Sequence, residues 1–345
     1  MNSRITKSLF CAVFALFTFF SCSDEMQDIK PITPINNNKA SIETEGISLT
    51  NEEFAAILNF TESLAAEEGT TIWTEASGRI TMIGTRYTSG YASHHTDVRC
   101  SVPSGYVVVG GGAVADYGSG AGAMLTASYP SSDKKAWLGS SKDHLYSNSH
   151  RLSVYAVGIK INGVSEATMK NYVQHYTRTS ISTSHPETEV AVNSTTHIMT
   201  GGGAKVNWSG YGNLLTESYP KDFRTWFVKS KDHKKSSPAT ITAYAVGIAK
   251  NISGFGTIEQ YRSHSSTYTG SGAVVTNLSI SNVNDFITNP YIVSCPGGRA
   301  TFSGSGRMLY GLHSDTEEAY AASKDHADAT SGYTYAYLVA LRDPY

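Results

Sequence analysis

After about residue 80, short runs rich in apolar and small residues are separated by polar and glycine-rich turn segments, and this pattern is typical of β-strands. Val107 to Ala115 and Met124 to Tyr129 are two such stretches, and the glycine-rich turn between them predicts a hairpin. A second hairpin is predicted from Trp137 to His144 and from Leu152 to Ile161, which a polar Ser-Asn-Ser segment separates. The last of these strands is apolar on both faces, so we expect it to be buried on both sides.

The same pattern occurs three times, so the chain contains an internal repeat, with units over residues 81–161, 168–250 and 257–343. Each unit carries a Gly-rich strand, an aromatic residue, the tetrapeptide Ser-Lys-Asp-His and a closing strand that begins at a tyrosine. The corresponding residues are Gly110 to Ala113, Gly201 to Ala204 and Gly297 to Ala300; Trp137, Trp226 and Tyr320; Ser141 to His144, Ser230 to His233 and Ser323 to His326; and Tyr155, Tyr244 and Tyr337.

About four strands for each unit predict an all-β fold for residues 81–343. Three similar four-stranded units favour a pseudo-threefold assembly of sheets like a β-prism, and tandem β-sandwich domains are the alternative. Residues such as Asn171 to Tyr176, between the units, can add further strands. One short amphipathic α-helix is expected before the β domain, over residues 48–69, because Thr50 and Glu53 have the spacing of a capping box and apolar residues follow at helical intervals.

The N-terminus has the pattern of an export signal. Arg4 and Lys7 precede an almost wholly apolar run from Leu9 to Phe20, which is too short to span a bilayer. Ser21 and Cys22 follow directly. Residues 23–47 contain two prolines, an asparagine run and few large apolar side chains, which predicts a flexible stalk.

The end of this signal resembles the lipobox of bacterial lipoproteins, although Phe19 and Phe20 depart from the usual residues. The resemblance implies a signal peptide over residues 1–22, with Cys22 as the lipidated first residue of the mature chain. Asp24 and Glu25 resemble the export tag of surface lipoproteins in one phylum of Gram-negative bacteria. We therefore expect a lipid-anchored protein of the outer membrane, displayed on the cell surface, with membrane contact through the anchor alone. An ordinary cleaved signal peptide with an incidental cysteine is the alternative.

The repeat units also carry a resemblance. Their pattern of Gly-Gly-Gly-Ala, Ser-Tyr-Pro, Trp and Tyr-Ala-Val is similar to repeats in many bacterial secreted and surface proteins, over roughly residues 98–343. Those proteins share no activity that carries over to this chain.

Charge is sparse, with Asp, Glu, Lys and Arg making up 16% of the chain. Without Arg4 and Lys7, 25 of the 27 basic residues face 29 acidic ones, so the mature chain has a formal net charge of about −4. Phosphate binding needs a basic face, so we expect no nucleic acid partner.

Two cysteines fall in the β domain. Cys100 and Cys295 could form one disulfide in an oxidising compartment, and two buried free thiols are the alternative. No metal-ligand spacing of cysteines is present, and we expect neither a metal nor a cofactor.

The Lys-Asp-His triplets are the candidate binding residues. In an extended strand Lys142 and His144 share one face and Asp143 lies on the other. Three copies near hairpin ends predict up to three equivalent sites for a glycan, in which the polar groups bind sugar hydroxyls and an aromatic ring stacks on the sugar. The candidate residues are Lys142, Asp143, His144 and Trp137; Lys231, Asp232, His233 and Trp226; and Lys324, Asp325, His326 and Tyr320.

A structural role for the triplets is the alternative, in which the aspartates cap turns, the lysines and histidines solvate an edge strand and the aromatic rings lie in the core. The chain would then be a structural or adhesive surface protein that binds a protein partner. Exposure of Trp137 and Trp226 favours the glycan site, and their burial favours the second class. Catalysis is not expected, because a hydrolase triad assembles once from distant segments.

Overall fold

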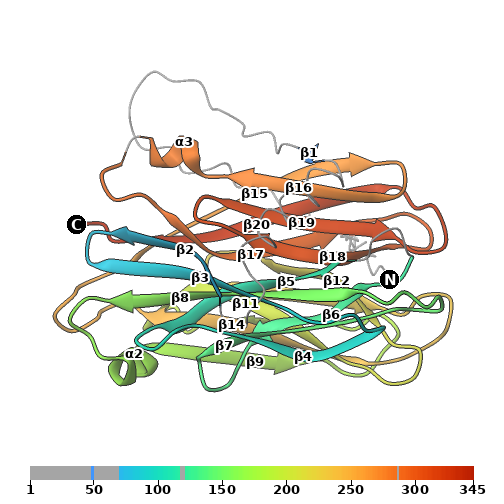
Figure 1. The fold of residues 1–345 in the computed structure, drawn as a ribbon, viewed down its shortest axis with the longest axis horizontal. Coiled ribbons are helices and arrows are strands. Elements are labelled where there is room, and N and C mark those ends of the chain that lie inside the picture. Colours follow the sequence, from blue (N-terminus) through green and yellow to red (C-terminus); the bar gives the residue numbers. More distant parts are fainter. Residues whose placement is uncertain (1–47, 50–69, 117–120, 286) are drawn as a thin grey trace, which may run out of the picture. The chain divides into compact units, whose positions relative to one another are not determined.

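The computed structural model describes residues 48–49, 70–116, 121–285 and 287–345, which belong to one compact unit of residues 42–345 (Figure 1). The predicted signal peptide, the lipidation site Cys22, the stalk 23–47 and most of the predicted helix 48–69 lie outside the described residues. Ser48 and Leu49, at the start of that predicted helix, form a short strand instead, paired with Thr276 and Val275.

The described residues form an all-β fold of antiparallel strands, as the recurring short strands of the sequence predict, together with two short helices that the sequence did not predict. The strands are β1 (Ser48–Leu49), β2 (Thr70–Ser77), β3 (Ile80–Thr88), β4 (His94–Ser101), β5 (Val107–Asp116), β6 (Met124–Pro130), β7 (Ala136–Lys142), β8 (Arg151–Ile161), β9 (Val173–Thr179), β10 (Glu187–Ala191), β11 (His197–Asn207), β12 (Leu214–Pro220), β13 (Thr225–Lys231), β14 (Thr240–Ala249), β15 (Glu259–Thr269), β16 (Ala273–Ser279), β17 (Ile292–Ala300), β18 (Arg307–Ser314), β19 (Glu318–Asp325) and β20 (Gly332–Arg342). The helices are α2 (Glu166–Tyr172) and α3 (Ser281–Asn284), and among the described residues no helix has the length and hydropathy to cross a membrane.

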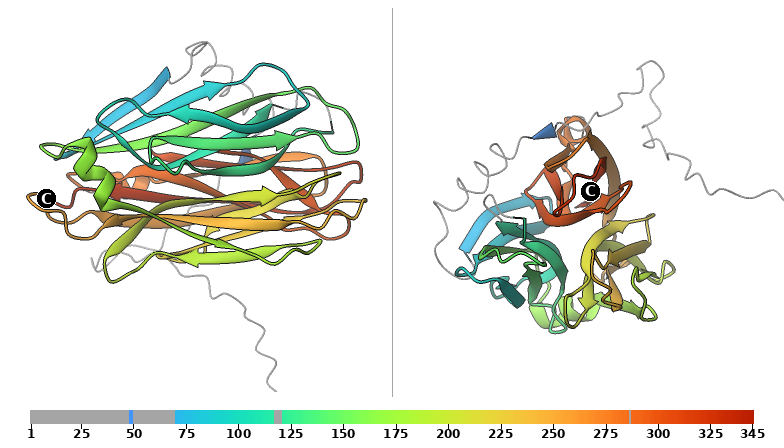
Figure 2. Two further views of the ribbon diagram at one scale, coloured as in Figure 1. Left: turned by 90° about the horizontal axis from the view of Figure 1, so that it is seen from below. Right: turned by 90° about the vertical axis from the view of Figure 1, so that its right-hand side faces the viewer.

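These strands make three sheets, in the orders β1-β16-β19-β18-β5-β8-β3-β2, β10-β13-β12-β17-β20-β15 and β4-β7-β6-β11-β14-β9. Each sheet joins two groups of strands from different stretches of the chain, and the groups meet at a short junction. The junctions pair β18 with β5, β12 with β17 and β6 with β11. Figure 2 is coloured along the sequence, so strands of similar colour belong to the same stretch of the chain, and they run side by side. Where the colour changes within a sheet, strands from two different stretches are paired.

Each predicted unit contains six strands where about four are expected. The sequence did not predict β3, β4, β10, β15 and β16, which lie at the beginning of the three units. It did predict a segment from Asn171 to Tyr176, which β9 overlaps. Strands such as β4, with the sequence His-His-Thr-Asp-Val-Arg-Cys-Ser, are partly exposed and carry polar residues on both faces, so they show no clear alternation. Helix α2 was also not predicted; it begins after Ser165, whose hydroxyl accepts a hydrogen bond from the Thr168 amide at 3.2 Å.

β-Bulges decide which residues of the Gly-rich strands correspond. The register shifts after Val108 in β5, after Met199 in β11 and after Val293 in β17. Counted from these bulges, the third counterpart of Gly110 to Ala113 is Cys295 to Gly298. The predicted counterpart, Gly297 to Ala300, is therefore displaced by two residues, because the sequence match followed a glycine pair and not the pairing register.

The cysteine that replaces a glycine in the third strand lies where the three Gly-rich strands approach one another. A Cβ atom on Gly201 would lie 2.7 Å from Cβ of Cys295, and one on Gly110 would lie 1.9 Å from the Ser294 carbonyl oxygen. The Cys295 thiol donates to the Gly202 carbonyl oxygen at 3.5 Å. One side chain therefore fills the space that two glycines leave open.

The expected alternatives for the two cysteines are resolved in favour of free thiols. Cys100 and Cys295 are both buried and unbonded to each other. Cys100 lies in β4 with its sulfur 3.4 Å from the Thr85 hydroxyl, while Cys295 lies in β17, in a different sheet. Burial raises the pKa of the Cys295 thiol to about 11. The predicted disulfide is therefore not present.

Candidate functional site

The three lysines of the Lys-Asp-His triplets are buried contacts between different stretches of the chain. Nζ of Lys142 donates to the carbonyl oxygen of Tyr211 at 2.5 Å, and Nζ of Lys324 donates to that of Gly122 at 2.5 Å. Nζ of Lys231 bonds to the carbonyl oxygen of Ser305. The first unit thus contacts the second, the second contacts the third and the third contacts the first.

Aromatic rings accompany these lysines. Nζ of Lys142 lies 3.9 Å from the ring centroid of Trp208, and Nζ of Lys231 lies 4.7 Å from that of Phe302. Burial lowers the pKa of Lys142 and Lys231 and brings that of Lys324 to about 7. Because each ammonium group is buried against a ring or a carbonyl oxygen, none of the three is presented to a ligand.

The three histidines of the triplets gather in one cluster. Ring centroids of His144, His233 and His326 lie 5.1 to 5.9 Å apart. Nε2 of His144 faces the carbonyl oxygen of His233 at 2.8 Å, and Nε2 of His326 faces that of His144. Burial, then the neighbouring His233 and His144, lowers the pKa of His326 to about 3. Across the described part of the chain, no group of three or more His, Cys, Asp or Glu side chains is placed to hold a metal ion.

The aspartates of the triplets shape the following loops. Oδ2 of Asp232 accepts from the Ser237 amide at 3.0 Å, and Oδ2 of Asp325 accepts from the Thr330 amide at 3.1 Å. Asp143 lies 3.2 Å from Nδ1 of His94. The residue after each triplet histidine has a positive φ: Leu145, Lys234 and Ala327. The triplets therefore have a structural role, with the aspartates at turns as the structural alternative predicts. The other part of that alternative is wrong, because the lysines and histidines do not solvate an edge strand but are buried between stretches of the chain.

The two tryptophans that were expected to stack on sugars are fully buried, and neither ring has a free face. A Cβ atom on Gly111 would lie 2.6 Å from Cγ of Trp137, and one on Gly202 would lie 2.3 Å from Cδ2 of Trp226. Each indole also donates to a serine hydroxyl, at 2.8 Å for Trp137 and 3.0 Å for Trp226. Both tryptophans are therefore core residues, and the ring of each covers a glycine.

Tyr320 is not the counterpart of the tryptophans. Trp137 pairs with Pro130 and Trp226 with Pro220, and the corresponding pair in the third stretch joins Ala319 to Ser314. Tyr320, one position on, is directed to the other face of its strand, where its ring stacks on that of His313. The sequence comparison matched one aromatic residue to another and missed this shift.

A different surface emerges at the end of the sheets where β7, β13 and β19 finish, which we call the loop end. Its loops span residues 89–93, 143–150, 180–186, 208–213, 232–239, 270–272, 301–306 and 326–331, and the described part of 117–123. Eight of the ten exposed large apolar side chains among the described residues lie in these loops or at the strand ends that border them: Tyr91, Leu145, Tyr146, Ile181, Tyr211, Tyr268, Phe302 and Tyr333.

The loop end is poor in charge and rich in small polar residues. The segment of residues 89–93 reads Ser-Gly-Tyr-Ala-Ser, and residues 208–213 read Trp-Ser-Gly-Tyr-Gly-Asn. Lys234 is paired with Asp328 at 2.7 Å. A linear pattern had no means of bringing these loops together, because they are far apart along the chain.

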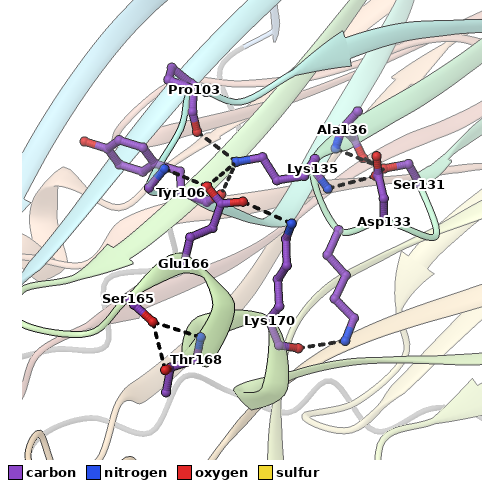
Figure 3. Close-up of polar contacts among 12 residues, drawn as sticks. Pro103, Tyr106, Ser131, Asp133, Lys135, Ala136, Ser165, Glu166, Thr168 and Lys170 are labelled. Atoms are coloured by element: carbon purple, nitrogen blue, oxygen red, sulfur yellow. Dashed lines mark hydrogen bonds and ion pairs between the residues drawn. The ribbon is translucent and has the colours of Figure 1, made fainter.

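The opposite end is charged and internally paired (Figure 3). Glu166 of α2 accepts a hydrogen bond from the Gly105 amide at 2.7 Å and pairs with Lys135 at 3.1 Å and Lys170 at 3.0 Å. The Gly105 amide, followed by the two lysines, lowers the pKa of Glu166 to about 2. These contacts fasten α2 to the neighbouring loops, so this cluster has a structural explanation.

The chain matches no protein-family model and no curated protein.

Proposed function

We propose that this chain is a cell-surface lipoprotein whose β domain is an adhesive module that binds a protein partner through the loop end. The observation that carries the proposal is the gathering of eight of the ten exposed large apolar side chains at that end. Exposed apolar side chains that cluster on one surface mark interaction sites.

The composition of the loop end supports a protein partner. Antibody loops are rich in Tyr, Ser, Gly and Asn, because tyrosine supplies a large contact area at low entropic cost and the small residues supply adaptable hydrogen bonds. Tyr91 is 70% exposed, Tyr146 55% and Tyr211 57%, and each lies beside serine or glycine.

Backbone hydrogen bonds join neighbouring loops of the loop end, from the Ala92 amide to the His150 carbonyl oxygen at 3.0 Å and from the Asp232 amide to the Ser184 carbonyl oxygen at 2.9 Å. These loops are therefore held in place before a partner binds.

A pseudo-threefold, β-prism-like assembly of three repeats is our proposal for the finer architecture. It is supported by the recurring strand order, the three short junctions and the lysine contacts that lead from each unit to the next. The right-hand view in Figure 2 shows three groups of strands around a common centre. Such an arrangement would present related loops from all three units at one end.

Attachment through Cys22 and the stalk 23–47 would present this domain outside the cell, at the outer membrane. Incorporation of a labelled fatty acid by the full chain, lost in Cys22→Ser, would support the anchor. A chain that carries no label in either form would contradict it. We propose binding and not catalysis, since the lysines, aspartates and histidines of the repeated tetrapeptide make structural contacts.

The triplets are no longer the basis for three equivalent glycan sites. Their lysines and the two tryptophans are buried, so a sugar could reach them only after the loops rearranged. Burial of those aromatic residues is the outcome that favours the adhesive protein.

Photo-crosslinking on intact cells tests the proposal. A photoreactive amino acid is placed at Tyr211 or at Tyr146, and the control position is Phe223, which is 42% exposed at the opposite end. We expect protein adducts from positions 211 and 146 and none from 223. Adducts from 223 alone, or from no position, would overturn the assignment.

A further inference from the structure

The second sheet carries a row of neighbouring aromatic rings on one face of β15, β20 and β12, separate from the triplets. We call this the tyrosine row, and it contains Tyr268, Tyr333, Tyr335, Tyr337 and Tyr219. Adjacent ring centroids along it lie 5.1, 6.1, 6.3 and 4.6 Å apart. The row passes from the exposed Tyr268 and Tyr333, through the half-buried Tyr335, to the buried Tyr337 and Tyr219.

The buried part of the row belongs to the fold. Tyr219 and Tyr337 stack over Gly297, where a Cβ atom would lie 3.0 Å from the Cα atom of Tyr219. The other sheets hold comparable pairs, Tyr129 with Tyr244 at 5.0 Å and His313 with Tyr155 at 4.1 Å. An aromatic pair at this place is therefore a packing feature of all three sheets.

The exposed part of the row has no such explanation. Counted back along the strand from Tyr337, Tyr333 and Tyr335 correspond to Arg151 and Ser153 before Tyr155, and to Thr240 and Thr242 before Tyr244. The same strand position therefore folds with small or polar residues in two of three cases. The fold therefore does not require a tyrosine at these positions, so we look for its role in binding.

Polar groups line the row. The Arg299 guanidinium lies 5.5 Å from the Tyr335 ring centroid and pairs with Glu217 at 3.2 Å. The His264 ring lies 6.3 Å from that of Tyr335. Arg262 donates to the Pro220 carbonyl oxygen at 3.2 Å, which fixes its position beside the buried end of the row. These groups offer hydrogen bonds next to apolar ring faces.

We propose that the tyrosine row is a single binding site for a short oligosaccharide. Aromatic faces beside fixed polar groups match the two surfaces of a pyranose ring, which has apolar C–H faces and a rim of hydroxyls. Tyr337 and Tyr219 are buried, so the accessible part of the row extends from His264 to Tyr268 in β15, where the strand rises about 13 Å at roughly 3.3 Å per residue. This length suits a short oligosaccharide and not one monosaccharide. The row shares Tyr268 and Tyr333 with the loop end, while Tyr335 and the polar groups beside it lie outside that surface, so the inference does not require a protein partner there.

A glycan array tests this site with the full-length chain in detergent, using oligosaccharides of neutral sugars, amino sugars and uronic acids. We expect binding to one class of oligosaccharide of two or more rings. Combined Tyr333→Thr and Tyr335→Thr, which install the residues of the second unit, should weaken that binding at least tenfold with an unchanged melting temperature. Tyr335→Phe, which keeps the ring, should retain most of it.

Tyr146→Ser is the matched control, because it removes an exposed tyrosine outside the row. Its glycan binding should equal that of the wild type. The site is overturned if the wild type binds no glycan on the array, if the Thr variant binds as the wild type does, or if only Tyr146→Ser loses binding. Photo-crosslinks from position 211 should persist in the Thr variant, so failure of the glycan site and failure of the protein partner give different results.

Discussion

Nε2 of His144 donates a hydrogen bond to the carbonyl oxygen of His233 at 2.8 Å, across 89 residues of sequence. The bond joins two copies of the same tetrapeptide. Nearby, Nζ of Lys142 donates to the carbonyl oxygen of Tyr211, so this contact also leads from the first unit to the second. The repeated Lys-Asp-His element therefore connects one unit to the next, and its conservation among the three units follows from that packing.

Loss of one lysine contact should destabilise the fold. Lys142→Ala removes a hydrogen bond from a charged donor and the contact with Trp208, so we expect the free energy of unfolding to fall by about 2 kcal/mol. Chemical denaturation monitored by circular dichroism measures the change. The control Lys235→Ala, at an exposed lysine, should change stability by less than about 0.5 kcal/mol. Equal effects of the two substitutions would contradict the contact.

Acid should destabilise the protein through a buried histidine. Burial, then the charge of Arg86, lowers the pKa of His313 to about 3, below its ordinary 6.5. Between pH 6.5 and pH 3 the His313 imidazole is protonated in the unfolded chain but neutral in the folded one. The stability that neutral His313 contributes is therefore fully present above pH 6.5 and is lost as the pH falls through this window. The expected slope is about 1.4 kcal/mol per pH unit.

His313→Tyr tests that contribution, because tyrosine occupies the corresponding positions 129 and 219. Unfolding free energies measured from pH 7 to pH 4 should fall less steeply in the variant than in the wild type. His175, whose pKa burial lowers to about 4, remains as a source of residual slope in both proteins. Parallel profiles would show that His313 does not titrate as described.

A side chain at the centre of the three Gly-rich strands should not be tolerated. Gly110→Ala places a Cβ atom 1.9 Å from the Ser294 carbonyl oxygen, and backbone atoms on both sides cannot move independently. We expect a loss of at least about 3 kcal/mol, or failure to fold, measured by thermal unfolding and by soluble yield. Gly270→Ala is the matched control, since a Cβ atom there meets nothing within 4 Å. Wild-type stability of Gly110→Ala would refute the close approach.

Both cysteines of the β domain should react only after unfolding. Cys100 and Cys295 are buried free thiols, and the raised pKa of Cys295 further reduces its thiolate fraction. Native protein treated with iodoacetamide at pH 8 should show neither residue alkylated in a peptide map. Protein unfolded without reductant should show both alkylated. A peptide pair linked through these cysteines would instead establish the disulfide.

The sequence predicted the all-β class and much of the second half of each stretch, because strands such as β5 and β8 are buried on both faces and read as apolar runs. It did not reveal strands such as β4 and β10, whose partly exposed faces mix polar residues without alternation. It matched Tyr320 to the tryptophans because residue type, and not pairing register, was all that a linear comparison could use.

The candidate binding surfaces divide in the same way, into residues that the sequence indicated and residues that only the structure brought out. Sequence inspection selected Lys142, Trp137 and their counterparts because they recur, yet recurrence marks what packing requires as readily as what a ligand requires. The tyrosines that stand out in the structure, Tyr333 and Tyr335, differ from their counterparts in the other two stretches.

By itself, then, the sequence determined the short apolar runs that form strands, the internal repeat and the pattern of basic and apolar residues at the N-terminus, all of which depend on neighbours in the chain. Only the tertiary structure decided the rest. The bulges set the register, the register set which side chain faces the core, and the pairing of distant strands brought loops from residues 91 to 333 to one end. Burial and exposure depend on those non-local contacts, so no linear pattern could assign them.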